Sequence, residues 1–411
     1  MRKYLILLFT AILCFSCSDE IPNKVKTTKQ GRIVYAYLIS NNVAGSLDSF
    51  LKQNICDMYE GLALSGEENS LLVYYRPYSF DQLFNGLPSI LEFNFNGKNK
   101  INGKHILQGK ELDISNIISQ AIVHPCSSAE NHVATDPATM RRVLTDMQKI
   151  SPATQYGLIF GSHGTGWIEG NSVKSKSFGD DAGYNINIPE LANVLKESFG
   201  DKKLDFILFD ACMMGAAEVA YEVRDATRYM VASALETPVD GFPYVSILPY
   251  LYKENVDYNA VCSSFIDFNI QKKTWGTVAA VDCSKMDTLA RWVKKSLPVY
   301  EPAFQTLYLP SIQQYGLRSF LNVSFDVVDV FRHLNAGTAP EELVKIMDEV
   351  VIAKDCMEIS GDPSFPGVKK ETFCGIGMYL PNKYYKEKWN RYYPELAWYD
   401  AVGWGHILNS K

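Results

Sequence analysis

Histidine is scarce in this sequence, which has 6 in 411 residues. The histidines show no metal-ligand spacing with the cysteines, so we predict no metal site. The H-E-x-x-H, Walker A and G-x-S-x-G motifs are also absent, and no such pattern supports a competing chemistry. Internal repeats and low-complexity tracts are missing as well. We therefore expect the chemistry of the chain to depend on a few single side chains.

An excess of charge of either sign is missing too. Lysine and arginine number 40 against 46 aspartates and glutamates, and the formal net charge is −6. This balance gives no reason to expect nucleic acid or an anionic membrane surface as a partner. Apolar residues make up 47% of the chain, enough to bury a large core in one large domain or two.

Cysteine is present without the dense, regular spacing of a disulfide scaffold. Beyond the N-terminal segment, the cysteines stand at positions 56, 126, 212, 262, 283, 356 and 374. Most of them are expected to be small buried apolar residues. Cys212 differs, because it follows a strand-like run and precedes a glycine.

The N-terminal apolar run, over 4–13, is too short to span a bilayer. Basic residues precede it, which is typical of a secretory signal. Ser16 and Cys17 resemble a bacterial lipobox, whose cysteine is lipidated and becomes the first residue of the mature chain. The acidic pair that follows soon after resembles surface-export signals of some outer-membrane lipoproteins.

We therefore predict a lipoprotein signal over 1–17, lipidation at Cys17 and a flexible tether over 18–30. The expected location is the cell envelope, with the lipid in the outer membrane. Surface exposure and secretion of the chain both stay open. Ordinary cleavage and secretion is the alternative.

Strand-like apolar runs alternate with helical spacing over about 250 residues, which predicts a parallel α/β sandwich. The run over 32–39 is typical of a strand covered on both faces, and 137–150 is predicted to be a helix with proline near its start. In the last third, we predict a helix around 340–354 and a strand over 373–380. Pattern alone leaves open whether this third is a separate domain or extends the first sheet.

Two strand-like runs end in reactive side chains. The run over 158–160 leads into Gly161-Ser162-His163-Gly164-Thr165-Gly166-Trp167, and the run over 204–209 leads into Asp210-Ala211-Cys212-Met213-Met214-Gly215. Reactive groups collect beyond the carboxyl ends of the strands in an open parallel sheet. If the two strands are neighbours, His163 and Cys212 lie side by side. A thiol beside an imidazole is the minimal equipment for covalent catalysis on a peptide carbonyl.

Both residues also have a structural explanation. A histidine in a strand-end loop is usually structural or solvated, and a single cysteine is commonly a buried, inert thiol. The glycines around His163 favour a reactive site, because they let the Gly164 N–H approach a ligand closely. Trp167 is expected to wall the cleft. A strand-to-helix turn at Cys212 would place helix N-terminal N–H groups near its thiolate.

The paired motifs resemble those of the caspase-like superfamily of cysteine peptidases, although caspases carry Gln-Ala-Cys where this chain has Asp-Ala-Cys. The fuller set is similar to the clostripain family, and it includes Glu236-Thr237-Pro238-x-Asp240-Gly241-Phe242-Pro243-Tyr244. The resemblance implies a caspase-like α/β/α sandwich with a mostly parallel central sheet over 31–290. We expect 291–411 to form a C-terminal α/β region packed on or extending this core.

The resemblance implies cleavage after Arg or Lys, which needs an acidic S1 pocket. Asp210, two residues before Cys212, and Asp240 can supply two carboxylates for a guanidinium or ammonium group. The alternatives are that Asp210 caps the following helix and that Asp240 only shapes the turn at Gly241.

In the predicted mechanism, Cys212 attacks the scissile carbonyl and forms an acyl-enzyme. His163 protonates the leaving amine and later helps to activate water. The backbone N–H groups of Gly164 and Cys212 hold the oxyanion. The dyad often suffices in sites of this superfamily, and no third member is assigned.

The segment over 168–187 is polar, which by itself indicates only an exposed loop. Clostripain-like relatives are activated by self-cleavage after a basic residue in this region, so Lys174 and Lys176 are the candidate cleavage sites. No cofactor is expected to be required. Calcium stimulates some relatives and stays a candidate, although the chain has no compact calcium loop. The expected partners are protein or peptide substrates with a basic P1 residue, and a monomer is expected.

Two other functions stay open. The first is a surface lipoprotein that keeps the fold as a non-catalytic binding protein, although His163 and Cys212 together argue against a dead enzyme. The second is cleavage after Asp or Asn, as elsewhere in the superfamily. Acidic residues at 210 and 240 argue against this specificity, because an acidic pocket repels Asp.

Overall fold

A computed structural model describes residues 28–42, 45–66, 68–94, 114–126, 132–168, 178–304, 306–317, 321–359, 367–381 and 387–405. The predicted signal over 1–17, Cys17, Lys174 and Lys176 lie outside these residues.

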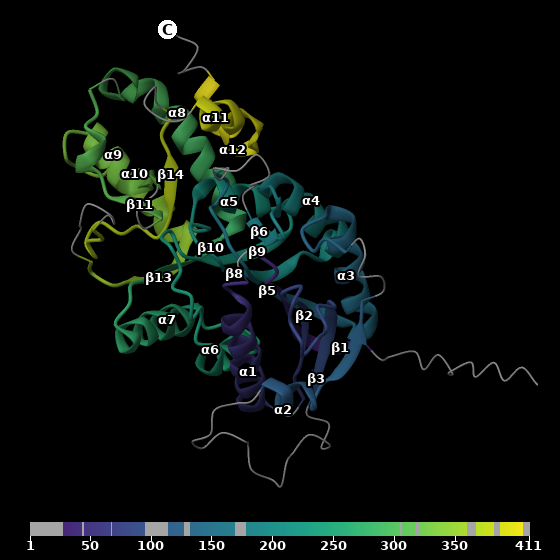
Figure 1. Cartoon of the computed structure of the whole chain (residues 1–411). Coiled ribbons are helices and arrows are strands. Elements are labelled where there is room, and N and C mark those ends of the chain that lie inside the picture. Colours follow the sequence, from purple (N-terminus) through teal and green to yellow (C-terminus); the bar gives the residue numbers. More distant parts are fainter. Residues whose placement is uncertain are drawn as a thin grey trace, which may run out of the picture.

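A central sheet carries its strands in the order β13-β10-β9-β8-β5-β1-β2-β3-β4 (Figure 1). Strands β9, β8, β5, β1 and β2 are parallel neighbours, and antiparallel strands flank them on both sides. The bounds are β1 (Lys29–Ile39), β2 (Ser70–Arg76), β3 (Ser89–Asn94), β4 (Ile122–Pro125), β5 (Ala153–Gly161), β8 (Leu204–Asp210), β9 (Thr227–Ala232), β10 (Thr277–Asp282) and β13 (Val351–Cys356).

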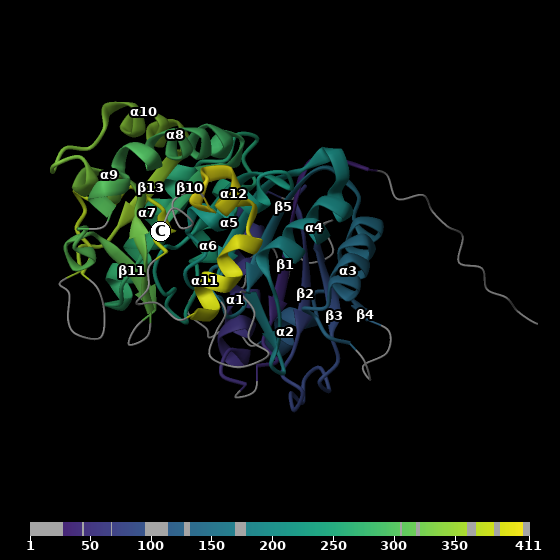
Figure 2. The ribbon, with the colours of Figure 1, turned by 90° about the horizontal axis from the view of Figure 1, so that it is seen from above.

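Helices cover both faces of this sheet (Figures 1 and 2). One face carries α1 (Asp48–Leu64), α2 (Ile114–Ile118), α6 (Tyr244–Leu251) and α7 (Tyr258–Lys272), and the other carries α3 (Pro137–Ile150), α4 (Ile188–Phe199), α5 (Ala217–Val223) and α8 (Met286–Phe304). Successive side chains of a strand enter opposite layers: in β1, Tyr35 and Tyr37 pack on one side, and Val34 and Ala36 pack on the other. The predicted α/β/α sandwich is confirmed.

Helix α3 shows how local sequence sets an element. The Asp136 carboxylate accepts a hydrogen bond from the Thr139 N–H at 2.9 Å, and Pro137 opens the first turn. The apolar face of the helix is buried through Met140, Val143, Leu144 and Met147. Both ends of the helix predicted over 137–150 are confirmed.

The C-terminal third adds one strand to the central sheet and builds a second, smaller sheet. Strand β13 pairs with β10, and the smaller sheet has the order β11-β12-β14. Helix α12 packs against α5 and α8 (Figures 1 and 2). The remaining bounds are β6 (Phe178–Asp181), β7 (Tyr184–Ile186), β11 (Gln314–Leu317), β12 (Leu321–Asp326), α9 (Val327–Leu334), α10 (Glu341–Val350), β14 (Gly377–Tyr379), α11 (Glu387–Tyr392) and α12 (Ala397–Val402).

Two predicted elements in this third are wrong in extent. The helix predicted around 340–354 ends at Val350, because the next residues pair with β10 and become β13. The strand predicted over 373–380 shortens to β14. The N–H of Cys374 donates instead to the Asp326 carboxylate at 2.7 Å, and Gly375 has a φ of +112°.

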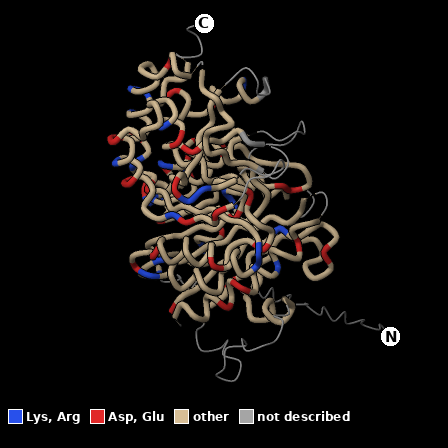
Figure 3. The backbone as a smooth tube through the Cα atoms, turned by 90° about the vertical axis from the view of Figure 1, so that its left-hand side faces the viewer, with Lys and Arg blue, Asp and Glu red and all other residues tan. Residues whose placement is uncertain are grey.

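Acidic and basic residues are interspersed along the described chain (Figure 3). Among the described residues, no helix combines the length and apolar character needed to cross a membrane.

Candidate active site

His163 and Cys212 follow adjacent strands. Strands β5 and β8 pair in parallel, with Gly161 opposite Asp210, and each candidate residue comes two positions later. The Ser162 N–H donates to the Asp210 carbonyl at 3.4 Å, which continues the contact past the strand ends. The predicted adjacency of the two strands is confirmed, and both side chains emerge at the same edge of the sheet.

Hydrogen bonds to the residues after β9 hold the loop that carries Cys212. The Met213 N–H donates to the Leu235 carbonyl at 2.9 Å, and the Gly215 N–H donates to the Ser233 carbonyl at 2.7 Å. Met213 itself has a left-handed φ of +59°, which few residues with a side chain adopt. The backbone around the thiol is therefore fixed by its neighbours in the sheet.

The expected helix N-terminus next to Cys212 is wrong. Helix α5 begins only at Ala217, because 211–216 form an irregular loop bonded to the end of β9. The helix therefore supplies no N–H group beside the thiol.

The thiol of Cys212 is partly buried and lies 3.8 Å from the carbonyl oxygen of Thr237, to which it can donate a hydrogen bond. Burial raises the pKa of this thiol to about 12, and the carboxylates of Glu236 and Asp210 add to the increase. In this conformation Cys212 is therefore a neutral thiol.

His163 lies in an exposed position on the facing loop. Its Nε2 is 3.1 Å from the side-chain nitrogen of Asn42, and its carbonyl accepts a hydrogen bond from the Gly179 N–H at 2.9 Å. Partial removal of the ring from water lowers its pKa, and the nearby Asp180 carboxylate opposes that change. The imidazole is therefore mostly neutral at pH 7 and able to accept a proton.

The glycines of the histidine loop let it lie directly on the cysteine loop. A β-carbon added to Gly164 would stand 2.9 Å from the Cys212 carbonyl oxygen, and one added to Gly166 would stand 2.8 Å from the Met213 carbonyl oxygen. Within the described residues, the N–H groups of Gly164 and Cys212 donate to no other residue, and the Cys212 N–H faces its own sulfur. Both groups are thus free to donate to a ligand.

Asp210, two residues before Cys212, is buried, with 8% of its surface exposed. Its carboxylate accepts hydrogen bonds from the Tyr244 hydroxyl at 2.7 Å and from the Phe242 N–H and the Asn54 amide at 3.4 Å each. Burial raises the pKa of Asp210 to about 6, and the hydrogen bonds from Tyr244 and Phe242 oppose this increase. Asp210 does not cap α5, whose N-cap residue is Ala216.

Asp240 lies in the loop that packs against Asp210. Gly241, with a φ of +70°, brings this loop so close that an added β-carbon would collide with the Asp210 carboxylate. The Asp240 carboxylate pairs with Lys272 at 3.0 Å. Asp240 is therefore already paired with a lysine of α7.

Trp167 does not wall an open cleft, contrary to expectation. It is 2% exposed, and its ring centroid lies 5.0 Å from that of Tyr379 and 4.9 Å from that of Tyr393. The buried Glu218 carboxylate binds the same C-terminal residues, accepting from the Tyr379 N–H at 2.8 Å and the Tyr393 hydroxyl at 3.1 Å. The C-terminal region therefore braces the histidine loop.

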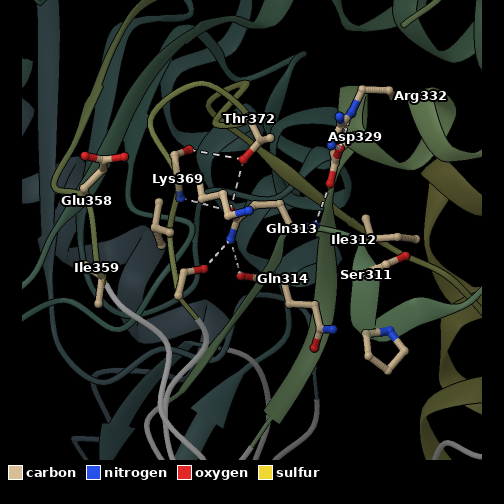
Figure 4. A pocket seen from close by; sticks show the side chains of 13 residues that line it. Ser311, Ile312, Gln313, Gln314, Asp329, Arg332, Glu358, Ile359, Lys369 and Thr372 are labelled. Carbon is tan, nitrogen blue, oxygen red and sulfur yellow. Dashed lines mark hydrogen bonds and ion pairs between the residues drawn. The ribbon is translucent and has the colours of Figure 1, made fainter. Parts of the chain in front are cut away.

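A cavity of about 610 Å³ is lined by residues of β11 and α9 and by residues around Lys369 (Figure 4). Its central polar side chain, Gln313, binds the Gly367 carbonyl, the Lys369 N–H and the Thr372 hydroxyl. These groups satisfy one another, and the cavity contains no thiol or imidazole. Among the described residues, no group of three or more His, Cys, Asp or Glu could hold a metal ion.

Sequence reasoning missed three partners of the predicted residues: Asn42 on His163, Thr237 on Cys212, and Tyr244 on Asp210. Thr237 and Tyr244 belong to the motif over 236–244. This motif indicated that the segment matters for the site, but it did not indicate which residues the two side chains contact. Asn42 follows β1, the strand next to β5, so the rule on strand ends also applies to it.

The mostly parallel core is a caspase-like fold, and a thiol and an imidazole follow two of its neighbouring strands, an arrangement that cysteine peptidases use. Comparison with known proteins agrees, since the sequence model of the clostripain family matches residues 36–410. The chain belongs to the clostripain family.

Solved structures show the same fold. The chain is similar to an inactive zymogen C11 protease from Parabacteroides distasonis, with 23% identity, a TM-score of 0.69, and coverage of 92% of this chain and 99% of that one. It is also similar to the secreted C11 cysteine protease "iotapain" from Bacteroides thetaiotaomicron, with 23% identity, a TM-score of 0.70, and coverage of 92% and 100%. A structure of a secreted C11 protease from the same organism in complex with an irreversible peptide inhibitor gives 22% identity, a TM-score of 0.70, and coverage of 92% and 99%. No curated protein matches the chain.

Proposed function

We propose that this clostripain-family peptidase cleaves peptide bonds after Arg or Lys, with Cys212 as nucleophile and His163 as acid and base. The observation that carries the proposal is the convergence at one sheet edge of a thiol, an imidazole, two N–H groups that donate to no other residue and a buried carboxylate. Each group has a separate task in acyl transfer to a thiol.

The reaction needs both strand-end loops. His163 takes the proton of the Cys212 thiol as the sulfur attacks the carbonyl carbon. The N–H groups of Gly164 and Cys212 then donate to the oxygen that becomes negative. The imidazolium next protonates the leaving amine, and the neutral ring activates the water that releases the acid product.

The basic specificity rests on Asp210, with Asp240 as the second carboxylate. At neutral pH, above its pKa of about 6, Asp210 is mostly ionised in a site largely closed to water. A charge-assisted contact to guanidinium or ammonium is strong in such surroundings. The Lys272 partner of Asp240 is 46% exposed and can swing into solvent when a substrate cation arrives.

The uncut chain is proposed to be a precursor. A pKa of about 12 leaves the Cys212 thiol protonated at pH 7, and the thiol faces the Thr237 carbonyl. The expectation of a loop over the whole of 168–187 is wrong for its second half, where β6 and β7 form a strand pair. Gly179 belongs to β6, three residues after Lys176 in the sequence, and its N–H donates to the His163 carbonyl. Self-cleavage after Lys174 or Lys176 would thus alter a segment in contact with the catalytic histidine.

Export and lipid attachment at Cys17 complete the proposal. Replacement of Cys17 by Ser should abolish incorporation of a labelled fatty acid and release the chain from membranes. A Ser variant that stays labelled would contradict the anchor.

Peptide cleavage tests the activity. Peptides that differ only at P1 (Arg, Lys, Asp, Asn and Ala) are incubated with the mature chain. Each protein sample is also checked for cleavage of the chain between 168 and 187. Activity on Arg or Lys should disappear in Cys212→Ala and persist in Cys262→Ala, whose thiol is buried at a distance in α7. Calcium and a chelator are compared in parallel. Absence of cleavage with a cut loop would favour the binding-protein alternative.

A further inference from the structure

Asn42 contacts the candidate catalytic histidine from the neighbouring strand. It follows β1, which pairs with β5, and is 6% exposed. Its Nδ2 lies 3.1 Å from Nε2 of His163 and 2.8 Å from the hydroxyl of Ser46. Its Oδ1 is buried without a hydrogen-bond partner in the described part of the chain. A buried amide with an unpaired oxygen thus abuts the imidazole.

The preceding residue shows what a purely structural amide looks like here. Asn41 donates to the Asp181 carboxylate at 2.5 Å and accepts from the Ser79 N–H at 2.8 Å and its hydroxyl at 2.7 Å. Both ends of the Asn41 side chain are satisfied. Asn42 leaves its acceptor open, although an unpaired buried oxygen is unfavourable.

The amide of Asn42 can serve both protonation states of the ring. With Nδ2 toward Nε2, it donates to a neutral imidazole whose proton is on Nδ1. Turned by 180°, it accepts through Oδ1 from Nε2–H and from the Ser46 hydroxyl. In the first orientation the amide oxygen of Asn42 has no partner, and in the turned orientation its N–H groups have none. Neither orientation is therefore favoured by the amide itself, and the position of the proton on the His163 ring decides between them.

We propose that Asn42 is a positioning residue that holds Nε2 of His163, so that Nδ1 alone exchanges protons during peptide cleavage. This rests on the proposed function. The thiol proton moves to Nδ1 as the bond between Sγ and the carbonyl carbon forms. It then moves from Nδ1 to the leaving nitrogen as the C–N bond breaks. Nε2–H stays bonded to Oδ1 of Asn42, which does not touch the substrate.

The orientation with Nδ2 toward Nε2 fits the resting state. It requires the proton on Nδ1, and a ring in that tautomer cannot take the thiol proton at Nδ1. The Cys212 thiol correspondingly faces Thr237. Activation therefore includes a turn of the Asn42 amide.

Three variants of the full chain test this role. Each variant is compared with the wild type after cleavage between 168 and 187 has been confirmed in both. Asn42→Leu keeps the size and removes the hydrogen bond, Asn42→Asp keeps an acceptor, and Asn269→Leu removes another buried amide, in α7. We expect Asn42→Leu to lower kcat by about 10- to 100-fold with KM within about twofold. Asn42→Asp should recover most of that loss and shift both limbs of the kcat/KM profile to higher pH, because the carboxylate favours the imidazolium. Asn269→Leu should lower only the melting temperature.

A wild-type kcat in Asn42→Leu would overturn the proposal, as would a folded Asn42→Asp no better than Asn42→Leu. If Asn42→Leu does not fold, an unshifted pH profile in Asn42→Asp overturns it. Alkylation of Cys212 by iodoacetamide needs no substrate. If the wild type cleaves no peptide, the proposed activity is wrong. The role of Asn42 can still be tested, because a pH profile of alkylation that is the same in Asn42→Asp and the wild type would overturn it.

Discussion

Gly164 lies against the backbone of Cys212, where an added β-carbon would stand 2.9 Å from the Cys212 carbonyl oxygen and 3.0 Å from the Ala211 β-carbon. A side chain at 164 must therefore push the two strand-end loops apart. Through this contact, the spacing of the proposed oxyanion donors depends on the absence of a side chain.

Gly164→Ala is expected to lower kcat/KM for a basic P1 peptide by about 10²-fold or more, the effect of losing one oxyanion donor. Gly405→Ala is the matched control, because its added β-carbon meets nothing closer than 3.5 Å. Steady-state kinetics on both variants measures the difference. Equal activity would show that the close approach of the loops is not needed.

Asp210→Asn should lower kcat/KM for Arg or Lys peptides by roughly 100-fold, equivalent to about 3 kcal/mol for a lost charge-assisted contact. In the wild type, the carboxyl is neutral below its pKa of about 6. KM for a basic P1 residue should thus rise as the pH falls through 6, and that rise should vanish in Asp210→Asn. Asp225→Asn, at an exposed ion pair, should change neither. A pH-dependent KM that survives in Asp210→Asn would assign the titration to another group.

Trp167→Ala should reduce both stability and activity, because Trp167 links the histidine loop to the C-terminal tyrosines. Removal of a buried tryptophan costs about 3–5 kcal/mol. Trp398→Ala is the matched control, because it also removes a buried tryptophan: Trp398 is fully buried against Tyr221 of α5. Denaturant unfolding and kinetics on the folded fraction separate the two effects. Equal specific activity in both variants would argue that the C-terminal region does not support the loop.

Glu218 should make the stability of the chain depend on pH. Burial raises its pKa from 4.5 to about 7, because ionisation is costly inside the protein. Because the folded chain holds this proton more tightly than the unfolded chain does, the protonated carboxyl stabilises the folded state. The full contribution is present below pH 4.5, the pKa in the unfolded chain, and it is lost as the pH rises from 4.5 through 7.

Glu218→Gln should flatten that part of the stability–pH curve, measured by urea unfolding between pH 5 and pH 8. Glu197→Gln, at a surface ion pair with Arg141, should leave the curve unchanged. An equally steep curve in Glu218→Gln would assign the dependence elsewhere.

Local sequence predicted much of the fold because several elements carry their own signals. The buried strands are near-continuous apolar runs, and α3 has a cap, a proline and an amphipathic face. The apolar residues after Val350 fit either a helix or a strand, and local pattern could not choose between them. Pairing with β10, whose partner residues lie 70 to 79 positions earlier in the chain, made them strand β13.

The site divides in the same way. Sequence alone determined that a histidine and a cysteine each follow an apolar strand. The structure then placed these two strands side by side, so that both residues lie at one edge of the sheet. Only the tertiary structure decided what touches them. The Asn42–His163 contact joins residues 121 apart, Trp167 is covered by C-terminal tyrosines, and the thiol pKa is raised by burial where a local helix had been expected to lower it. These properties depend on packing between distant segments, which no local pattern encodes.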